Sequence, residues 1–290
     1  MHDAVAQIID ISRPLGHALH RLSHNWTAMA GGAIIVGLVI VAAIGPLLAP
    51  NDPLQQHPEL RLAAPDAQFP LGTDQLGRCV LSRLLYGARS SLEVAVVVVG
   101  AAAVAGILLG LISGYFGGLL DELLMRGVDV LLSFPGIIFA LLIVGIMGPS
   151  LINVMIGLTL VHWTSYARLM RGSVLAVKER PFVEAARALG AGHRRIMLGH
   201  ILPHCLGPIV VMATLGMGHV ILAAAAMSFL GLGAQPPTPE WGAMLNQARD
   251  FMRTAPNLML FPGLAIMVTV LSFNMLGDGL QDALDPRHQG

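Results

Sequence analysis

Charged residues are scarce in this sequence. Aspartate, glutamate, lysine and arginine make up 12% of its 290 residues, which is about half the share that is usual in a soluble domain. The formal net charge is zero, so no excess of basic residues indicates a nucleic-acid-binding surface. Hydrophobic residues make up 55% of the chain instead, and they gather in long runs. This composition excludes an ordinary soluble domain and indicates a membrane protein.

Lysine and cysteine are also rare, and each shortage excludes a kind of site. The single lysine, Lys178, lies in Leu175-Ala176-Val177-Lys178-Glu179-Arg180, whereas a Walker phosphate loop needs Gly-x-x-x-x-Gly-Lys before serine or threonine. We therefore expect no ATP hydrolysis by this chain and no cofactor in it. The two cysteines, Cys79 and Cys205, lack the Cys-x-x-Cys spacing of metal sites. The serines, histidines and acids show no catalytic spacing either, so we do not expect an enzyme.

The long apolar runs predict an all-α integral membrane protein. A helix of about 20 apolar residues crosses the ~30 Å hydrocarbon core of a bilayer, and it satisfies its backbone amides internally, as lipid requires. Six runs meet this condition, and the first is too long for the core of a cleaved signal peptide. The expected spans are about 27–48, 92–115, 130–147 with a kink at Pro135, 151–170, 201–230 and 258–276.

The charges between the runs predict the orientation. Six spans place both termini on one side, and with the N-terminus inside, eleven of the seventeen lysines and arginines face the cytoplasm. The positive-inside rule therefore favours cytoplasmic termini. The expected organisation is a cytoplasmic segment (1–26), a first transmembrane helix (27–50), an external segment with an amphipathic helix (51–91), a core domain with five transmembrane helices and a basic cytoplasmic loop at 171–199 (92–280), and a cytoplasmic tail (281–290).

Loop 171–199 has the pattern of two short helices joined by glycine. Pro181 suits the first turn of a helix, where its missing amide is harmless, and an alanine-rich stretch follows from Glu184 to Leu189. Gly190 and Gly192 can take the positive φ that ends a helix. A helix–glycine–helix element with small side chains fits a groove in a partner protein, but a solvated loop explains the same residues. The residues alone leave both interpretations open.

The same loop resembles the EAA loop of ABC importer permeases, because residues 184–190 read Glu-Ala-Ala-x-x-x-Gly. The run His200-Ile201-Leu202-Pro203 resembles the version in dipeptide, oligopeptide and nickel permeases. Cys79 departs from the family, which usually has an acid there. Further similar motifs follow in order between about residues 70 and 287: Leu71-Gly72-Thr73-Asp74 with Gly77-Arg78, Tyr86-Gly87-Ala88-Arg89-Ser90-Ser91-Leu92, Tyr166-Ala167-Arg168, Ser228-Phe229-Leu230-Gly231-Leu232-Gly233, Glu240-Trp241-Gly242, Gly277-Asp278-Gly279-Leu280 and Leu284-Asp285-Pro286.

This resemblance implies a type I permease bundle in the bacterial cytoplasmic (inner) membrane, of the kind that forms the second, C-type permease. It also implies four partners in the lipid bilayer or beside it: a second homologous permease, two ATPase subunits that bind ATP and Mg on the cytoplasmic side, and an external solute-binding protein facing loops 71–91 and 231–257. In this family the EAA loop forms the coupling helices that dock on the ATPases. The residues carrying that role here are Glu184, Ala185, Ala186, Leu189, Gly190, Gly192 and His193.

Histidines and methionines in the fourth and fifth spans are the candidates for the pathway. These are His162, His219, Met212 and Met217. Imidazole suits nickel and thioethers are soft ligands, and two further histidines lie four residues apart at the start of the fifth span. The candidate metal ligands are therefore His162, His200, His204 and His219. Any one of these histidines is more typical of a hydrogen bond between helices.

The function that the resemblance implies is half of a translocation pathway. Its cargo would be di- or oligopeptides, or nickel or a nickel chelate, and the sequence leaves these open. The alternative is a secondary transporter or channel that acts alone, in which inverted repeats or charged pairs at the membrane midplane are expected. We find neither in the sequence. A purely structural membrane protein is a third hypothesis.

Overall fold

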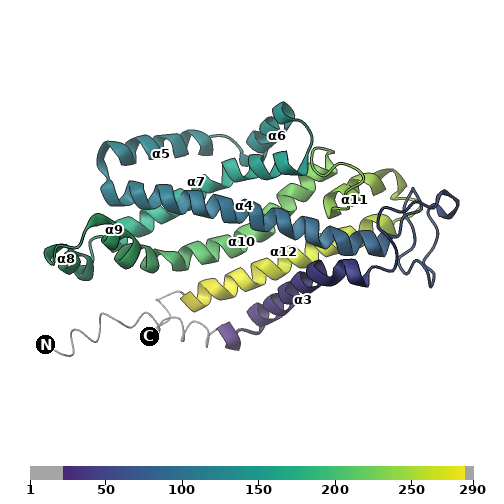
Figure 1. Ribbon diagram of the computed structural model, residues 1–290, viewed down its shortest axis with the longest axis horizontal. Coiled ribbons are helices and arrows are strands. Elements are labelled where there is room, and N and C mark those ends of the chain that lie inside the picture. Colours follow the sequence, from purple (N-terminus) through teal and green to yellow (C-terminus); the bar gives the residue numbers. More distant parts are fainter. Residues whose placement is uncertain (1–21, 285–290) are drawn as a thin grey trace.

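Long helices lie along the length of the molecule in the computed structural model, which describes residues 22–284 (Figure 1). They are α3 (Trp26–Leu48), α4 (Val80–Phe116), α5 (Gly118–Leu132), α6 (Gly136–Met147), α7 (Leu151–Val177), α10 (Leu202–Phe229) and α12 (Asn257–Leu284). The short elements are η1 (Pro58–Leu60), α8 (Pro181–Ala188), α9 (His193–Arg195), the π-helical turn η2 (Ile196–Ile201), α11 (Trp241–Ala248) and η3 (Arg249–Phe251). Residues 22–284 contain no strand, and the predicted all-α fold is confirmed.

The chain passes along the bundle six times if α5 and α6 are taken as one pass. The start of α3 and the end of α12 lie at the end that carries α8 and α9, here called the α8 end (Figure 1). The connection from α3 to α4 lies with α11 at the opposite end, the α11 end (Figure 1). An even number of passes returns the chain to its starting side, as the sequence predicts. The expected terminal segments fall largely on residues 1–21 and 285–290, which lie outside the described residues.

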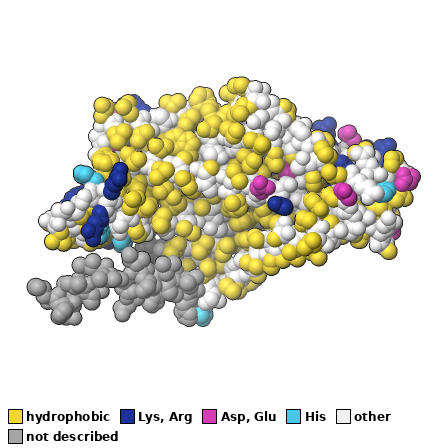
Figure 2. All heavy atoms as spheres, viewed as in Figure 1, with side chains coloured by type: hydrophobic (Ala, Val, Ile, Leu, Met, Phe, Trp, Pro, Cys, Tyr) yellow, Lys and Arg dark blue, Asp and Glu magenta, His cyan; other side chains and the backbone are white. Residues whose placement is uncertain are grey.

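Five of the six passes satisfy the length and composition of a membrane span within residues 22–284. Four are continuous helical stretches, α3, α4, His193–Phe229 and α12, and the fifth is the pair α5 and α6. The remaining pass is α7, which carries His162, Arg168 and Arg171, and these side chains lower its hydropathy. Helix α7 lies against α4 over the most extensive helix–helix contact of the bundle. Hydrophobic side chains cover the middle of the face shown in Figure 2, and most charged ones lie toward the two ends.

Four expected helix boundaries are wrong. The second span begins at Val80 instead of 92, because the amphipathic segment expected before it is part of the same continuous helix α4. The third is two helices, bent by 86°. Pro135, just before α6, has no backbone N–H to donate, and it disfavours helical backbone at the residue before it. The helix therefore ends before Pro135 and a new helix begins after it, whereas a single kinked helix was expected. The fourth span continues to Val177, past the expected end at 170, and the last helix continues to Leu284, past the expected end at 276.

Glycines on one face of α4 allow it to lie close against α7. Gly106, Gly110 and Gly114 are spaced by four residues and are buried, a pattern that brings helices together in membranes. A Cβ atom on Gly110 would lie 2.8 Å from the Cβ of Met170, and one on Gly114 would lie 2.9 Å from the Cβ of Val174. Side chains larger than hydrogen therefore do not fit at these positions without moving α7.

Candidate functional site

The loop at the α8 end folds as the glycine pattern predicts. Pro181 is the first residue of α8, where no intrahelical donor is needed. Val183 and Ala186 are buried beneath the helix, while Glu184 faces solvent. Leu189, directly after the helix, is 88% exposed. The fold of residues 22–284 leaves this apolar side chain uncovered.

Gly190 ends α8 in a Schellman motif. Its φ is +78°, in the left-handed region, its amide donates to the carbonyl of Arg187, and the amide of Ala191 donates to the carbonyl of Ala186. Both bonds are those that define the motif. Gly192 has φ −70° and ψ 157°, so the expected positive φ at this second glycine is wrong. Extended backbone there leads directly into α9.

The second half of the loop is joined to two neighbouring helices. The Nδ1 atom of His193 is hydrogen-bonded to the Tyr115 hydroxyl at 2.8 Å, near the end of α4. From His193 the chain continues through the π-helical turn and α10 without a break to Phe229. Ile196 and Ile201 are buried in this turn. Any force on α8 and α9 is therefore applied to the ends of α4 and α10.

His200 and His204 help to hold this loop. The ring of His204 stacks on Phe182 of α8, with 4.8 Å between centroids, and its Nδ1 donates to the carbonyl of His200 at 2.8 Å. His200 lies within the π-helical turn at 196–201, which changes the helical register between the two histidines. The imidazole of His204 is thus used at the α8 end and is not brought to the other two candidate ligands.

His162 and His219 do come together. Their ring centroids are 6.5 Å apart, across the contact between α7 and α10, and the Nδ1 of His162 donates to the carbonyl of Leu158 at 2.8 Å. Met212 and Met217 are half-buried on α10. In the part of the chain that the structure describes, no group of three or more histidine, cysteine or acidic side chains is placed to hold a metal ion.

Two ion pairs join α5 to α7, and sequence reasoning missed both. Both carboxylate oxygens of Asp121 accept from Arg171, each at 2.6 Å, and Asp121 also accepts from Ser113. About two helical turns further along α5, Asp129 accepts from Arg168 at 2.6 Å. The two acids are eight residues apart on one helix, which places them on the same face, and this spacing was the available signal.

A cavity of about 660 Å³ lies beside the second ion pair. It is lined by residues from the end of α5, from α7 and from α10: Leu132, Ser165, Arg168, Leu169, Gly172, Ser173 and Met212. Most of this lining is apolar, with two hydroxyl groups and one guanidinium. Among the residues expected for the pathway, only Met212 lines this cavity.

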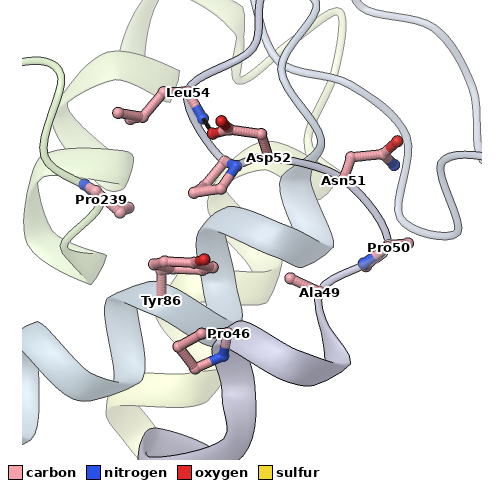
Figure 3. Close-up of a pocket in the computed structure, with 9 residues that line it drawn as sticks. Pro46, Ala49, Pro50, Asn51, Asp52, Leu54, Tyr86 and Pro239 are labelled. Atoms are coloured by element: carbon pink, nitrogen blue, oxygen red, sulfur yellow. Dashed lines mark hydrogen bonds between the residues drawn. The ribbon is translucent and has the colours of Figure 1, made fainter.

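The α11 end carries a second hollow, of about 410 Å³, between the end of α3 and the start of α4 (Figure 3). Tyr86 of α4 and Pro239 lie on one side of it, and Pro46 and Leu54 contribute further apolar surface. Nearby, the carboxylate of Glu240 caps α11 by accepting from the amides of Gly242 and Ala243. The hydroxyl of Ser91 donates to the same carboxylate, and the indole of Trp241 donates to the carbonyl of Leu84, so loops 71–91 and 231–257 form one surface.

Comparisons with known proteins agree on one family. Residues 106–289 match the model described as "binding-protein-dependent transport system inner membrane component", and residues 13–65 match the "N-terminal TM domain of oligopeptide transport permease C". The dipeptide transport system permease protein DppC of Alkalihalophilus pseudofirmus is 46% identical over 94% of this chain and 90% of its own length. The di/tripeptide transport system permease protein DppC of Pseudomonas aeruginosa is 42% identical over 99% and 97%.

A third relative and one solved structure extend this result. The glutathione transport system permease protein GsiD of Escherichia coli is 46% identical over 93% of this chain and 89% of its own length. An inward-facing structure of the MetNI methionine ABC transporter matches with a TM-score of 0.54 and 21% identity, and covers 70% of this chain and 96% of the matched chain. At that identity the match concerns the fold alone.

Proposed function

This chain belongs to the family of binding-protein-dependent transport system inner membrane components and is a transmembrane permease of an ABC importer, and from this premise we propose that it forms half of a pathway for short peptides. The other half would be a second homologous permease. Two ATPase subunits would bind to the α8 end, which we place in the cytoplasm together with both termini. An external binding protein would deliver cargo at the α11 end.

The observation that carries the coupling proposal is the shape of α8 and its turn. The helix presents exposed Glu184 and Leu189 outward, while its buried side holds it against the π-helical turn. Binding of α8 in a groove of an ATPase subunit would cover Leu189. Because α9 is continuous with α10 and is bonded to Tyr115, movement of the ATPase would tilt α10 and α4 together. Such a tilt is what alternating access requires.

Leu189 provides the test of docking. Burying a leucine side chain stabilises an interface by about 1.5–3 kcal/mol, so Leu189→Ser should weaken binding of the purified ATPase subunits about tenfold or more. Leu198→Ser is the control, since Leu198 is also exposed but lies on the π-helical turn. Equal ATPase binding by the two serine variants, measured by co-purification and titration, would argue against α8 as the docking element. A stand-alone transporter would co-purify with no ATPase at all.

The orientation has a separate test. Single cysteines are introduced at Thr238 and at Gly192 in a chain whose own two cysteines are buried. A membrane-impermeant maleimide added to intact cells should label the cysteine at 238 and not the one at 192. The reverse pattern would place the α8 end outside and would end the docking proposal as well.

For the cargo, we propose a short peptide with free termini. The relatives are named for dipeptide, di/tripeptide and glutathione transport, and all of these solutes are short peptides. The 660 Å³ cavity has Arg168 in its wall, paired with Asp129. These opposite charges can exchange partners with the carboxylate and the amine of a zwitterionic peptide. Both side chains are more than half exposed, so the exchange needs little desolvation.

Uptake of a labelled dipeptide tests this site. Arg168→Gln should reduce uptake several-fold while the complex still assembles. The control is Arg126→Gln, because Arg126 also forms an ion pair within the membrane-spanning part, with Glu122 on α5 at 3.0 Å, but it does not line the cavity. Normal uptake by the Arg168 variant would rule out this contact, and equal losses in both variants would indicate a general effect of charge.

Nickel is the second candidate cargo. One observation favours it: the ring centroids of His162 and His219 are 6.5 Å apart. Two imidazoles that face each other across α7 and α10 could pass a cation or its chelate. Changing both histidines to alanine should then abolish nickel uptake and spare dipeptide uptake. If cells carrying the unaltered protein take up no nickel, or the double variant takes up as much as they do, this hypothesis is wrong.

A further inference from the structure

Two buried arginines and one buried acid meet where the segment after α3 packs on the start of α4. The side chains of Arg78, Arg83 and Asp74 are 3%, 1% and 8% exposed. One oxygen of Asp74 lies 2.7 Å from the Nε of Arg78 and 3.5 Å from the Nε of Arg83. Its other oxygen accepts from the amides of Leu76 and Arg78. One carboxylate thus faces two guanidinium groups, which leaves one positive charge unbalanced.

The remaining acceptor in this cluster is neutral. The Oε1 atom of Gln247 accepts from Arg78 at 2.9 Å and from Arg83 at 3.1 Å. An amide oxygen satisfies hydrogen-bond donors but cannot neutralise a charge. The Nη1 atom of Arg83 is buried and has no hydrogen-bond partner within residues 22–284. A buried charged donor without an acceptor is destabilising, and a bound acceptor at this atom would remove that penalty.

A small cavity is lined in part by Arg83. Its volume is about 20 Å³, and its polar lining comes from Asp74, Gln75, Arg83 and Gln247, with apolar side chains closing the rest. A site for one water-sized particle needs roughly 10–15 Å³, so the cavity has room for one particle of that size. Because the oxygen of Gln247 is already occupied, its free end is the NH₂ group, a donor. The guanidinium of Arg83 and this NH₂ group are donors, while both oxygens of Asp74 already accept hydrogen bonds.

We propose that this cavity binds one monatomic anion, of which chloride is the physiological form. The anion would accept from Nη1 of Arg83 and would balance the second arginine. A water molecule would satisfy the donor but would leave the net positive charge in a dry environment, which is costly for a buried ion. The anion would complete a cluster that joins the segment after α3, α4 and α11. This inference concerns the architecture of the α11 end and does not depend on the proposed cargo or docking.

Halide dependence of thermal stability provides the first test. The full-length chain, purified in detergent, is unfolded at equal ionic strength in potassium chloride, potassium bromide and potassium gluconate. A ligand that binds only the folded state stabilises it by RT ln(1 + [L]/Kd), so the melting temperature should rise with the logarithm of halide concentration above Kd. We expect rises of roughly 2–4 °C in both halides over gluconate. Equal melting temperatures in the three salts would overturn the proposal.

Gln247→Glu separates an anion from a water molecule. Glutamate is nearly isosteric with glutamine and supplies the missing negative charge, so this variant should keep its stability in gluconate and lose its response to halide. Gln55→Glu, at an exposed position of the segment after α3, is the control and should keep the full response. A halide response that persists unchanged in Gln247→Glu contradicts the proposal.

A direct measurement covers the case in which the Gln247 variant does not fold. Crystals of the unaltered protein grown in bromide should show an anomalous peak within hydrogen-bond distance of the Arg83 Nη1. If that position instead refines as water without anomalous signal in saturating bromide, the cavity holds only water and the proposal is wrong.

Discussion

Replacing Gly190 with valine strains the turn after α8 without creating a clash. The φ of +78° at this residue is unfavourable for any side chain with a Cβ atom, by roughly 1–2 kcal/mol, and more so when the side chain is β-branched. A Cβ atom built at Gly190 meets no described atom within 4 Å. The whole cost is therefore conformational and falls on the Schellman motif that ends α8.

This cost predicts a defect in coupling and not in folding. Since 1.4 kcal/mol corresponds to a factor of ten in an equilibrium constant, the strain should lower the equilibrium constant for forming the α8 turn about five- to thirtyfold. The long helices do not depend on this turn. We expect normal membrane insertion, an unchanged melting temperature of the bundle and a large loss of peptide-stimulated ATP hydrolysis in the reconstituted complex.

Gly192→Val is a closely matched control. It places the same side chain two residues away, again with no described atom within 4 Å of its Cβ. The backbone at Gly192 has φ −70° and ψ 157°, an extended conformation that valine adopts without strain. The two variants differ in backbone strain and little else. Equal hydrolysis rates for Gly190→Val and Gly192→Val, or a normal rate for Gly190→Val, would refute the argument that the left-handed turn sets the docking geometry.

Three further changes test the packing of the bundle. Gly110→Val should destabilise the contact of α4 with α7 by about 1–3 kcal/mol through overpacking, and so lower the melting temperature. Gly100→Val is the control, because a Cβ atom there meets no described atom within 4 Å. Similar melting temperatures for the two variants would contradict the close packing of α4 on α7. Asp121→Asn and Arg171→Gln should be non-additive, with a coupling energy of about 1 kcal/mol or more in a double-mutant cycle, and additive effects would mean that the pair is not formed in the membrane. Trp241→Phe removes the bond from the indole Nε1 to the carbonyl of Leu84, 3.0 Å long, and should cost about 0.5–1.5 kcal/mol of unfolding free energy; no loss would indicate that the bond is absent in solution.

The sequence by itself was sufficient for the all-α membrane fold and the even number of passes. Apolar run length and the need to satisfy backbone amides in lipid are properties of each segment alone, so they can be evaluated without a partner segment. The bounds of α8 were also local: Pro181 sets its start and Gly190 its end, because both act through their own backbone angles. Gly192 shows where local reasoning fails: glycine can adopt a positive φ, but the φ of Gly192 is negative.

Only the tertiary structure decided which distant polar groups meet. Asp121 and Arg171 are 50 residues apart, and Arg83 and Gln247 are 164 apart. Their pairing depends on the register between packed helices, which hydropathy does not encode. The candidate histidines lie in two separate places for the same reason. His162 and His219 meet across α7 and α10, while His204 stacks on Phe182 at the α8 end. Helix formation is governed by neighbours in the chain, whereas a site between helices is governed by how their side chains interlock.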